Sequence, residues 1–102
     1  MQTAKTRALC AIVRAETRPG ADARFEALLQ DLAFHVAADE PGCTSFVVSR
    51  VMGSRVHFAV HARFLTWRAF RRHSETDHFN RTLPGLADLL AAPISMEIFL
   101  EV

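Results

Sequence analysis

Residues 43–64 read CTSFVVSRVMGSRVHFAVHARF and predict a β-hairpin in the middle of the chain. The second half, residues 56–64, alternates apolar with polar or small side chains, which is the period of a strand that buries one face. Its apolar face carries Phe58, Val60, Ala62 and Phe64. Residues 43–51 alternate in the same way, and the connection at residues 52–55 has hairpin length and contains glycine. We therefore expect two antiparallel strands here, each with one face toward a core.

On the N-terminal side of the hairpin we expect a strand followed by a helix. Residues 8–14 are apolar and β-branched at two positions, which favours a strand, and Thr17-Arg18-Pro19-Gly20 ends it with turn residues. From residue 21 to about residue 38 apolar residues recur at helical spacing. They are Phe25, Leu28, Leu29, Leu32 and Val36. Glu40-Pro41-Gly42 ends the helix, because proline cannot continue it.

The C-terminal side predicts helical segments and a last strand. Thr66 is a plausible N-cap for a helix over residues 67–73. Ser74-Glu75-Thr76-Asp77 has the capping-box pattern that starts a further helix. Pro84-Gly85 is expected to break that helix, with one more turn at most after it. Residues 94–102 alternate strictly between apolar and other side chains, as a strand does.

The resulting order, β-α-β-β-α-β, is that of an α+β ferredoxin-like fold with a four-stranded antiparallel sheet. The 102 residues make one domain, residues 1–102, with a core over about residues 8–102. Helices on one face would leave the other face of the sheet bare, and Phe99 lies on that bare face with several small residues. We therefore predict a homodimer that packs sheet against sheet.

Composition excludes several classes of function. The net charge of +1 gives no electrostatic basis for binding nucleic acid, and no apolar run is long enough to span a membrane. Cys10 and Cys43 fall on strands that are not neighbours in this fold, so we expect buried free thiols and a cytoplasmic protein. No glycine-rich phosphate loop or dinucleotide fingerprint is present.

The histidines do not predict a metal site. His57 and His61 share one strand face but stand about 13 Å apart, too far to bind one ion together. His73 and His78 would stand about 140° apart on one continuous helix. No cysteine or carboxylate completes a ligand set at a recognisable spacing, so the expectation is no metal.

The segment of residues 67–73 allows two interpretations. Trp67, Phe70 and His73 recur at i, i+3 and i+6, roughly one helical face. They are either core residues with a histidine at the rim, or the wall of an apolar cavity in which a neutral His73 accepts a proton. His78, beside Phe79, allows the same two interpretations.

Several of these segments together resemble the antibiotic biosynthesis monooxygenase (ABM) family. The family typically shows an acidic-Pro/Gly-Gly-Cys turn, here residues 40–43, and a helix that ends in histidine, here residues 66–73. A His-Phe step follows about five residues later, here within Asp77-His78-Phe79. The first turn, residues 17–20, also looks like that of the family. The resemblance covers about residues 8–102.

The resemblance implies a dimeric α+β barrel and oxygenation of electron-rich aromatics, such as quinols or anthrones, without a cofactor. On this basis His73 is the candidate base, and His78 is a second proton carrier or an oxyanion donor. The resemblance also implies that a small aromatic substrate binds between aromatic side chains. These are Phe64, Trp67, Phe70 and Phe79.

The chain departs from the family pattern in two places, and other functions stay open. Where the third strand in the family often ends Glu-x-Trp, this chain has Ala62-Arg63-Phe64. The haem-degrading branch uses an asparagine on the first strand, and residues 8–14 contain none, which disfavours a haem function. The alternatives are a non-catalytic dimer that binds a small ligand, and an isomerase or signal-degrading enzyme of the same fold. RNA binding is disfavoured by the near-neutral charge.

Overall fold

The computed structural model describes residues 6–102, and its elements follow the predicted order, with two separate helices between the third and fourth strands as expected. The elements are β1 (Leu9–Glu16), α1 (Asp22–Asp39), β2 (Cys43–Arg50), β3 (His57–Phe64), α2 (Trp67–His73), α3 (Asp77–Asp88) and β4 (Ser95–Leu100). The four strands form one antiparallel sheet in the order β2-β3-β1-β4. The predicted α+β ferredoxin-like fold is therefore confirmed.

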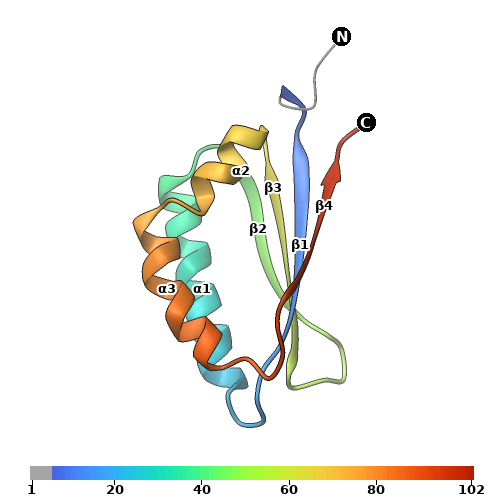
Figure 1. Cartoon of the computed structure of the whole chain (residues 1–102), viewed down its shortest axis with the longest axis vertical. Helices are drawn as coiled ribbons and strands as arrows, with labels where there is room; N and C mark the ends of the chain where they lie inside the picture. The colour runs from blue at the N-terminus through green and yellow to red at the C-terminus, as the bar shows by residue number, and fades with distance from the viewer. Residues whose placement is uncertain (1–5) are drawn as a thin grey trace.

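The helices lie on one face of the sheet and leave the other face without a helical cover. In Figure 1, α1 and α3 run side by side over the covered face, and α2 lies near the end of the sheet where β3 finishes. The opposite face bears the ion pairs Arg14–Glu97 and Arg63–Glu101 together with Phe99. No helix among the described residues is long and apolar enough to cross a membrane.

The core is built from the apolar faces that the sequence pattern predicts. The even-numbered residues of β3 from Phe58 to Phe64 are buried, and α1 buries Phe25, Leu29, Leu32 and Val36. One cluster lies under α1, where the rings of Phe25 and Phe58 are 5.1 Å apart. A second cluster joins Leu9, Ala62 and Phe64 to α2 through Ala69 and Phe70. Each large side chain buried here contributes about 1.5–3 kcal/mol to folding.

The prediction that Pro84-Gly85 breaks the last helix is wrong, because α3 continues through both residues to Asp88. Proline removes one backbone donor, but apolar residues beyond it pack on the core and hold the last turns in place. These residues are Leu86, Leu89 and Leu90. The helix start is also shifted, because Thr76 and not Ser74 is the N-cap, accepting from Phe79 N.

Two further expectations are resolved at the edges of the sheet. Cys10 and Cys43 are free, as predicted, but both are half-buried and not enclosed in the core. On β4, Met96, Ile98 and Leu100 pair with β1 residues that face the helices, yet each is 40–53% exposed because no helix reaches that edge. An apolar strip along β4 is therefore left open.

Candidate active site

The end of α1 fixes a buried carboxylate. Glu40 is the C-cap of α1, and its backbone N–H donates to Val36 O at 2.9 Å. Its own carbonyl accepts from Cys43 N at 3.0 Å, so both sides of the residue are tied down before β2 begins. Only 8% of Glu40 is exposed. A buried carboxylate needs hydrogen-bond donors around it, because burial without them is costly.

Gly42 lets α2 come close to this carboxylate. A Cβ at residue 42 would lie 2.6 Å from the Cβ of Ala69, a distance that real Cβ atoms do not reach. The Gly42 carbonyl also accepts from Leu65 N at 2.8 Å, which fastens the turn to the end of β3. The turn and α2 are thus in direct contact, and α2 carries its last residue, His73, over Glu40.

The break between α2 and α3 determines where His78 lies relative to His73. Thr76 Oγ1 donates to His73 O at 2.8 Å and accepts from Phe79 N, so one side chain closes α2 and caps α3. Asn80 Nδ2 donates to the carbonyls of Ser74 and Thr76 at 3.0 and 2.9 Å. Because the chain turns here, His73 and His78 are not on one continuous helix, and both can face Glu40.

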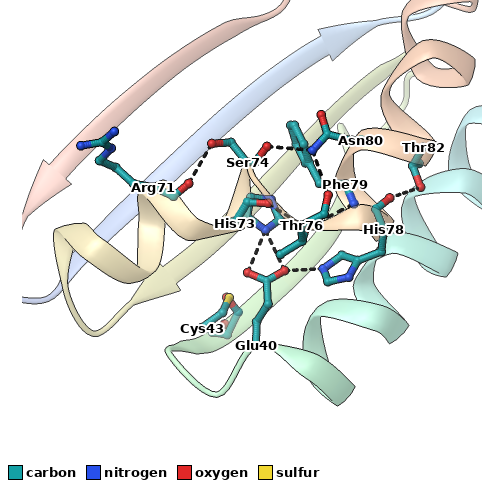
Figure 2. Close-up of polar contacts among 11 residues, drawn as sticks. Glu40, Cys43, Arg71, His73, Ser74, Thr76, His78, Phe79, Asn80 and Thr82 are labelled. Carbon is teal, nitrogen blue, oxygen red and sulfur yellow. Dashed lines mark hydrogen bonds and ion pairs between the residues drawn. The ribbon is translucent and has the colours of Figure 1, made fainter.

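Glu40, His73 and His78, hereafter the Glu-His-His cluster, form a closed polar group (Figure 2). His78 Nε2 lies 2.6 Å from Glu40 Oε2, and His73 Nδ1 lies 3.0 Å from both carboxylate oxygens. The side chains of Glu40 and His78 are 7% exposed and that of His73 is 13% exposed. An ionised carboxylate only accepts hydrogen bonds, so both imidazoles donate to it through these nitrogens.

The remaining nitrogen of each imidazole is free. Among residues 6–102, neither His73 Nε2 nor His78 Nδ1 has a hydrogen-bond partner. Neither nitrogen is fully buried. In that range Thr17 Oγ1 is the one fully buried side-chain polar atom that lacks a hydrogen-bond partner. Both nitrogens therefore reach solvent and present a lone pair when the ring is neutral.

Aromatic rings surround His73 on several sides. The ring centroid of Phe79 is 4.9 Å from that of His73, Phe64 is at 5.5 Å and Phe46 at 5.8 Å. Phe70 stacks edge-on to Phe64 at 5.5 Å, one layer further out. Such surroundings lower the local polarity, which strengthens the hydrogen bonds within the Glu-His-His cluster.

Two open grooves lie beside the cluster. The larger, of about 1110 Å³, runs between α1, α2 and the start of α3, and His78 and Trp67 are among its lining residues. Four arginines also line it, and none of them has an ion-pair partner among the described residues. These are Arg68, Arg71, Arg72 and Arg81. The smaller, of about 230 Å³, is lined by Glu40, Cys43 and Gly42 among others. His73 lines neither groove.

Cys43 borders the cluster but is not suited to nucleophilic chemistry. Burial raises the pKa of the Cys43 thiol above its ordinary value, and the nearby charge of Glu40 acts in the same direction. Hydrogen bonding with the Ser45 backbone acts in the opposite direction without reversing the rise in pKa. The thiol form dominates at neutral pH, so the chemistry of the site rests on the carboxylate and the imidazoles.

The family follows from a direct match. Residues 8–84 match the family model of antibiotic biosynthesis monooxygenases, which is well over half of the chain. The chain belongs to the antibiotic biosynthesis monooxygenase family. The ABM resemblance found in the sequence is thereby confirmed. Among proteins with curated descriptions, none matches significantly.

Solved structures of the same shape agree with this family. A candidate antibiotic biosynthesis monooxygenase from Caulobacter crescentus superposes with a TM-score of 0.91 at 23% identity, over 96% of this chain and 92% of that one. One from Nitrosomonas europaea gives 0.89 at 19% identity, over 99% and 96%. A conserved protein from Methanosarcina mazei gives 0.87 at 17% identity, over 96% of each. At these identities the likeness establishes the fold.

In this ABM chain the structure brings the two predicted catalytic residues, His73 and His78, onto one carboxylate. Phe64 and Phe79 contact His73, Phe70 lies behind Phe64, and Trp67 lines the larger groove 5.2 Å from Phe70. The residue that the sequence argument missed is Glu40, which was interpreted only as a helix terminator. The sequence did contain a signal for it, because Glu40 is the acidic residue of the acidic-Pro/Gly-Gly-Cys turn that the family shares.

Helical spacing alone does not identify this cluster. On one continuous helix His73 and His78 would stand about 140° apart, and no carboxylate lies at a recognisable spacing along the sequence. The chain breaks between α2 and α3, and Glu40, 33 residues before His73, supplies the carboxylate. Local spacing could not have revealed it, because the three residues come together only through the packing of three elements.

Proposed function

We propose that this chain is a cofactor-independent monooxygenase that oxidises quinol- or anthrone-like aromatics with O₂. His73 is the base, and Glu40 is the group that orients it. The observation that carries the proposal is the pairing of His73 Nδ1 with Glu40 at 3.0 Å, while His73 Nε2 makes no hydrogen bond to any of residues 6–102. A cytoplasmic location is part of the proposal, and the free cysteines support it.

Glu40 supports the role of His73 in two ways. As a hydrogen-bond acceptor it holds the proton of the neutral ring on Nδ1, so that the lone pair is on Nε2. As a negative charge it stabilises the imidazolium that forms when Nε2 takes a proton. His78 donates to the same carboxylate and holds it in place, with its own second nitrogen available as another proton carrier.

The chemistry needs no group beyond the substrate and O₂. Nε2 takes a proton from the activated C–H or O–H of the aromatic, and the resulting anion has the electrons that O₂ accepts. A carbon of the anion forms a bond to O₂, and protonation gives a hydroperoxide. The same carbon then loses its remaining proton as the O–O bond breaks, so that one oxygen stays in the product as a carbonyl and the other leaves as water.

The direct test is oxygen uptake by the metal-stripped protein with a panel of reduced quinols and anthrones, corrected for autoxidation. The proposal expects saturable uptake without added flavin, haem or metal. Product oxygen should derive from ¹⁸O₂, because one oxygen atom is retained. Uptake no faster than the uncatalysed rate across the panel contradicts it.

We also propose that the chain is a homodimer. Support comes from the open face of the sheet and from the apolar strip of β4, where Met96, Ile98 and Leu100 are 40–53% exposed. Native mass spectrometry should show twice 11.4 kDa. Ile98→Asp, which places a charge in this strip, should shift the population to monomer, and Glu26→Asp, at a half-exposed residue of α1, should not. A wild-type monomer at micromolar concentration overturns the dimer.

A second candidate function is the binding of a small anionic ligand without catalysis. The observation that favours it is the larger groove, in which four arginines outnumber the carboxylates of Asp39, Glu75 and Asp77 and adjoin the exposed ring of Trp67. Arginine suits carboxylates and stacks on aromatic rings. Quenching of the single tryptophan by aromatic carboxylates, with no accompanying oxygen uptake, would favour this function over the oxygenase.

A further inference from the structure

The Glu-His-His cluster is also a set of metal ligands. One ligand atom from each of the three side chains lies within 4.8 Å of the other two, and the nitrogens that face Glu40 are His73 Nδ1 and His78 Nε2. One carboxylate with two imidazoles is a donor set that Zn²⁺ and other divalent transition ions accept. The three ligands come from three elements, the end of α1, the end of α2 and the start of α3, so the fold and not one flexible loop holds them.

We propose that Glu40, His73 and His78 form a binding site for a divalent transition metal ion, with Zn²⁺ as the best match. The ion would take the place of the protons that the two imidazoles now donate to the carboxylate. Because each ring is neutral in the metal-free protein, the displaced proton would move to the other nitrogen of the same ring.

The geometry needs little change to hold the ion. Ligand atoms about 2.0–2.1 Å from a tetrahedral zinc are roughly 3.3 Å apart. The separations of 2.6 and 3.0 Å between the carboxylate and the imidazoles are shorter by less than about 1 Å, and the ligand atoms of the three side chains lie within 4.8 Å of one another. Three protein ligands leave a fourth position for water. The ion could approach from the smaller groove, which Glu40 lines, or from the larger, which His78 lines.

This site has a chemical consequence for His73 that rests on the proposed function. A neutral imidazole that binds a metal through Nδ1 has its proton on Nε2, so the lone pair that the proposed base uses is lost. The metal-bound form is then inactive in proton abstraction. The structure thus points to an oxygenase that Zn²⁺ inhibits, the opposite of the dependence that a metalloenzyme shows.

Binding is tested first on the metal-free wild-type chain, with Zn²⁺ alone and a chromophoric chelator as competitor. We expect one equivalent of Zn²⁺ per chain, and a visible d–d band of a four- or five-coordinate site when Co²⁺ is used. In ¹⁵N spectra of the histidine rings, Zn²⁺ should move the His73 and His78 signals and leave His57 and His61 in place. Absence of stoichiometric binding, or shifts at His57 and His61 instead, overturns the proposal.

Variants then assign the ligands. Glu40→Gln and His78→Gln should each weaken Zn²⁺ binding by at least about 10–100-fold. Loss of a residue that only hydrogen-bonds to a metal ligand already has an effect of that size. The matched control is His57→Gln, whose imidazole is exposed and lies 3.7 Å from Glu16. Circular dichroism identifies any variant that fails to fold, and the wild-type spectra decide the question in that case. Unchanged affinity in both folded cluster variants contradicts the site.

The experiment separates this inference from the proposed function. Zn²⁺ binding at the cluster without inhibition of oxygen uptake supports the site and removes His73 Nε2 as the base. Oxygen uptake without stoichiometric Zn²⁺ binding leaves the oxygenase and removes the site. The binding measurement requires no turnover, so it decides about the metal even if no substrate is oxidised.

Discussion

Two pairs of histidines in this chain have similar spacing and opposite surroundings. His57 and His61 lie four residues apart on β3 and point to the face of the sheet that has no helical cover, both exposed. His73 and His78 lie five residues apart on two helices, and both imidazoles meet Glu40 in a nearly closed space. His57 also has a carboxylate neighbour, because its Nε2 lies 3.7 Å from Glu16 Oε1, but the side chains of both residues are about half exposed.

The difference shows that burial and a shared partner, not spacing, mark a site. An exposed histidine–carboxylate pair is screened by water and contributes little, typically below about 1 kcal/mol. A buried carboxylate with two donors is coupled to both rings and fixes which nitrogen of each has the proton. The first two predictions below therefore change one member of the buried cluster and use the exposed pair as the control, and the other two change residues beside Glu40.

The largest effect is expected for His73→Ala. Loss of a positioned general base lowers kcat by about 10²–10⁴-fold. His57→Ala, on the exposed pair, should leave kcat unchanged. Steady-state oxygen uptake measures both, with thermal unfolding to verify the fold. If the two variants retain equal activity, the distinction between the two histidine pairs has no catalytic meaning.

Glu40→Ala is expected to destabilise the protein by about 2–5 kcal/mol, because two buried imidazole donors lose their acceptor. The matched control is Glu16→Ala, which removes the carboxylate beside exposed His57 and should cost less than about 0.5 kcal/mol. Urea unfolding gives both values. Similar losses in the two variants would mean that the buried carboxylate contributes no more than a surface one.

Gly42→Ala should cost about 1–3 kcal/mol, since its Cβ would lie 2.6 Å from that of Ala69 and push α2 away from Glu40. Activity should fall with stability, because α2 ends in His73. Ala69→Gly added to this variant should restore activity in part by removing the clash. A Gly42→Ala protein with wild-type stability would show that the contact does not position the helix.

The smallest effect is expected at Cys43, which borders the same carboxylate. Because burial raises the pKa of its thiol, the thiolate fraction in the folded protein stays below that of the unfolded chain and increases only at higher pH. Alkylation by iodoacetamide at neutral pH should therefore be slower at Cys43 in the folded protein than after denaturation. Cys43→Ala should keep kcat within about twofold, since no step uses the thiol. Fast alkylation together with lost activity would assign the thiol a part in the chemistry.

Most of the fold was predictable from periodicity. The faces of β3 and the stripe of α1 depend on local patterns that burial then satisfies, and the order of elements follows from them. Pro84 was misjudged because packing of the residues after it stabilises the helix more than proline destabilises it locally. The apolar strip of β4 could be recognised as a strand, but its exposure depends on which strands the helices cover.

The site was predictable in part, through the family motif. That motif and the aromatic spacing indicated His73 and His78. Their shared contact with Glu40 could not be predicted, because it depends on how the two helices pack against the end of α1. Glu40 was read as a turn residue, which it also is. A carboxylate that caps one helix and accepts from the next two acquires its second role only when α1, α2 and α3 pack together.

The central claim is that Glu40 holds the His73 ring with its proton on Nδ1 and a free lone pair on Nε2. Long-range ¹H–¹⁵N spectra of the histidine rings in the metal-free protein at neutral pH test it most directly. The account predicts a neutral His73 ring protonated at Nδ1, with His78 protonated at Nε2. A His73 ring protonated at Nε2, either alone or on both nitrogens, would contradict it, because no lone pair would then be available to accept a proton.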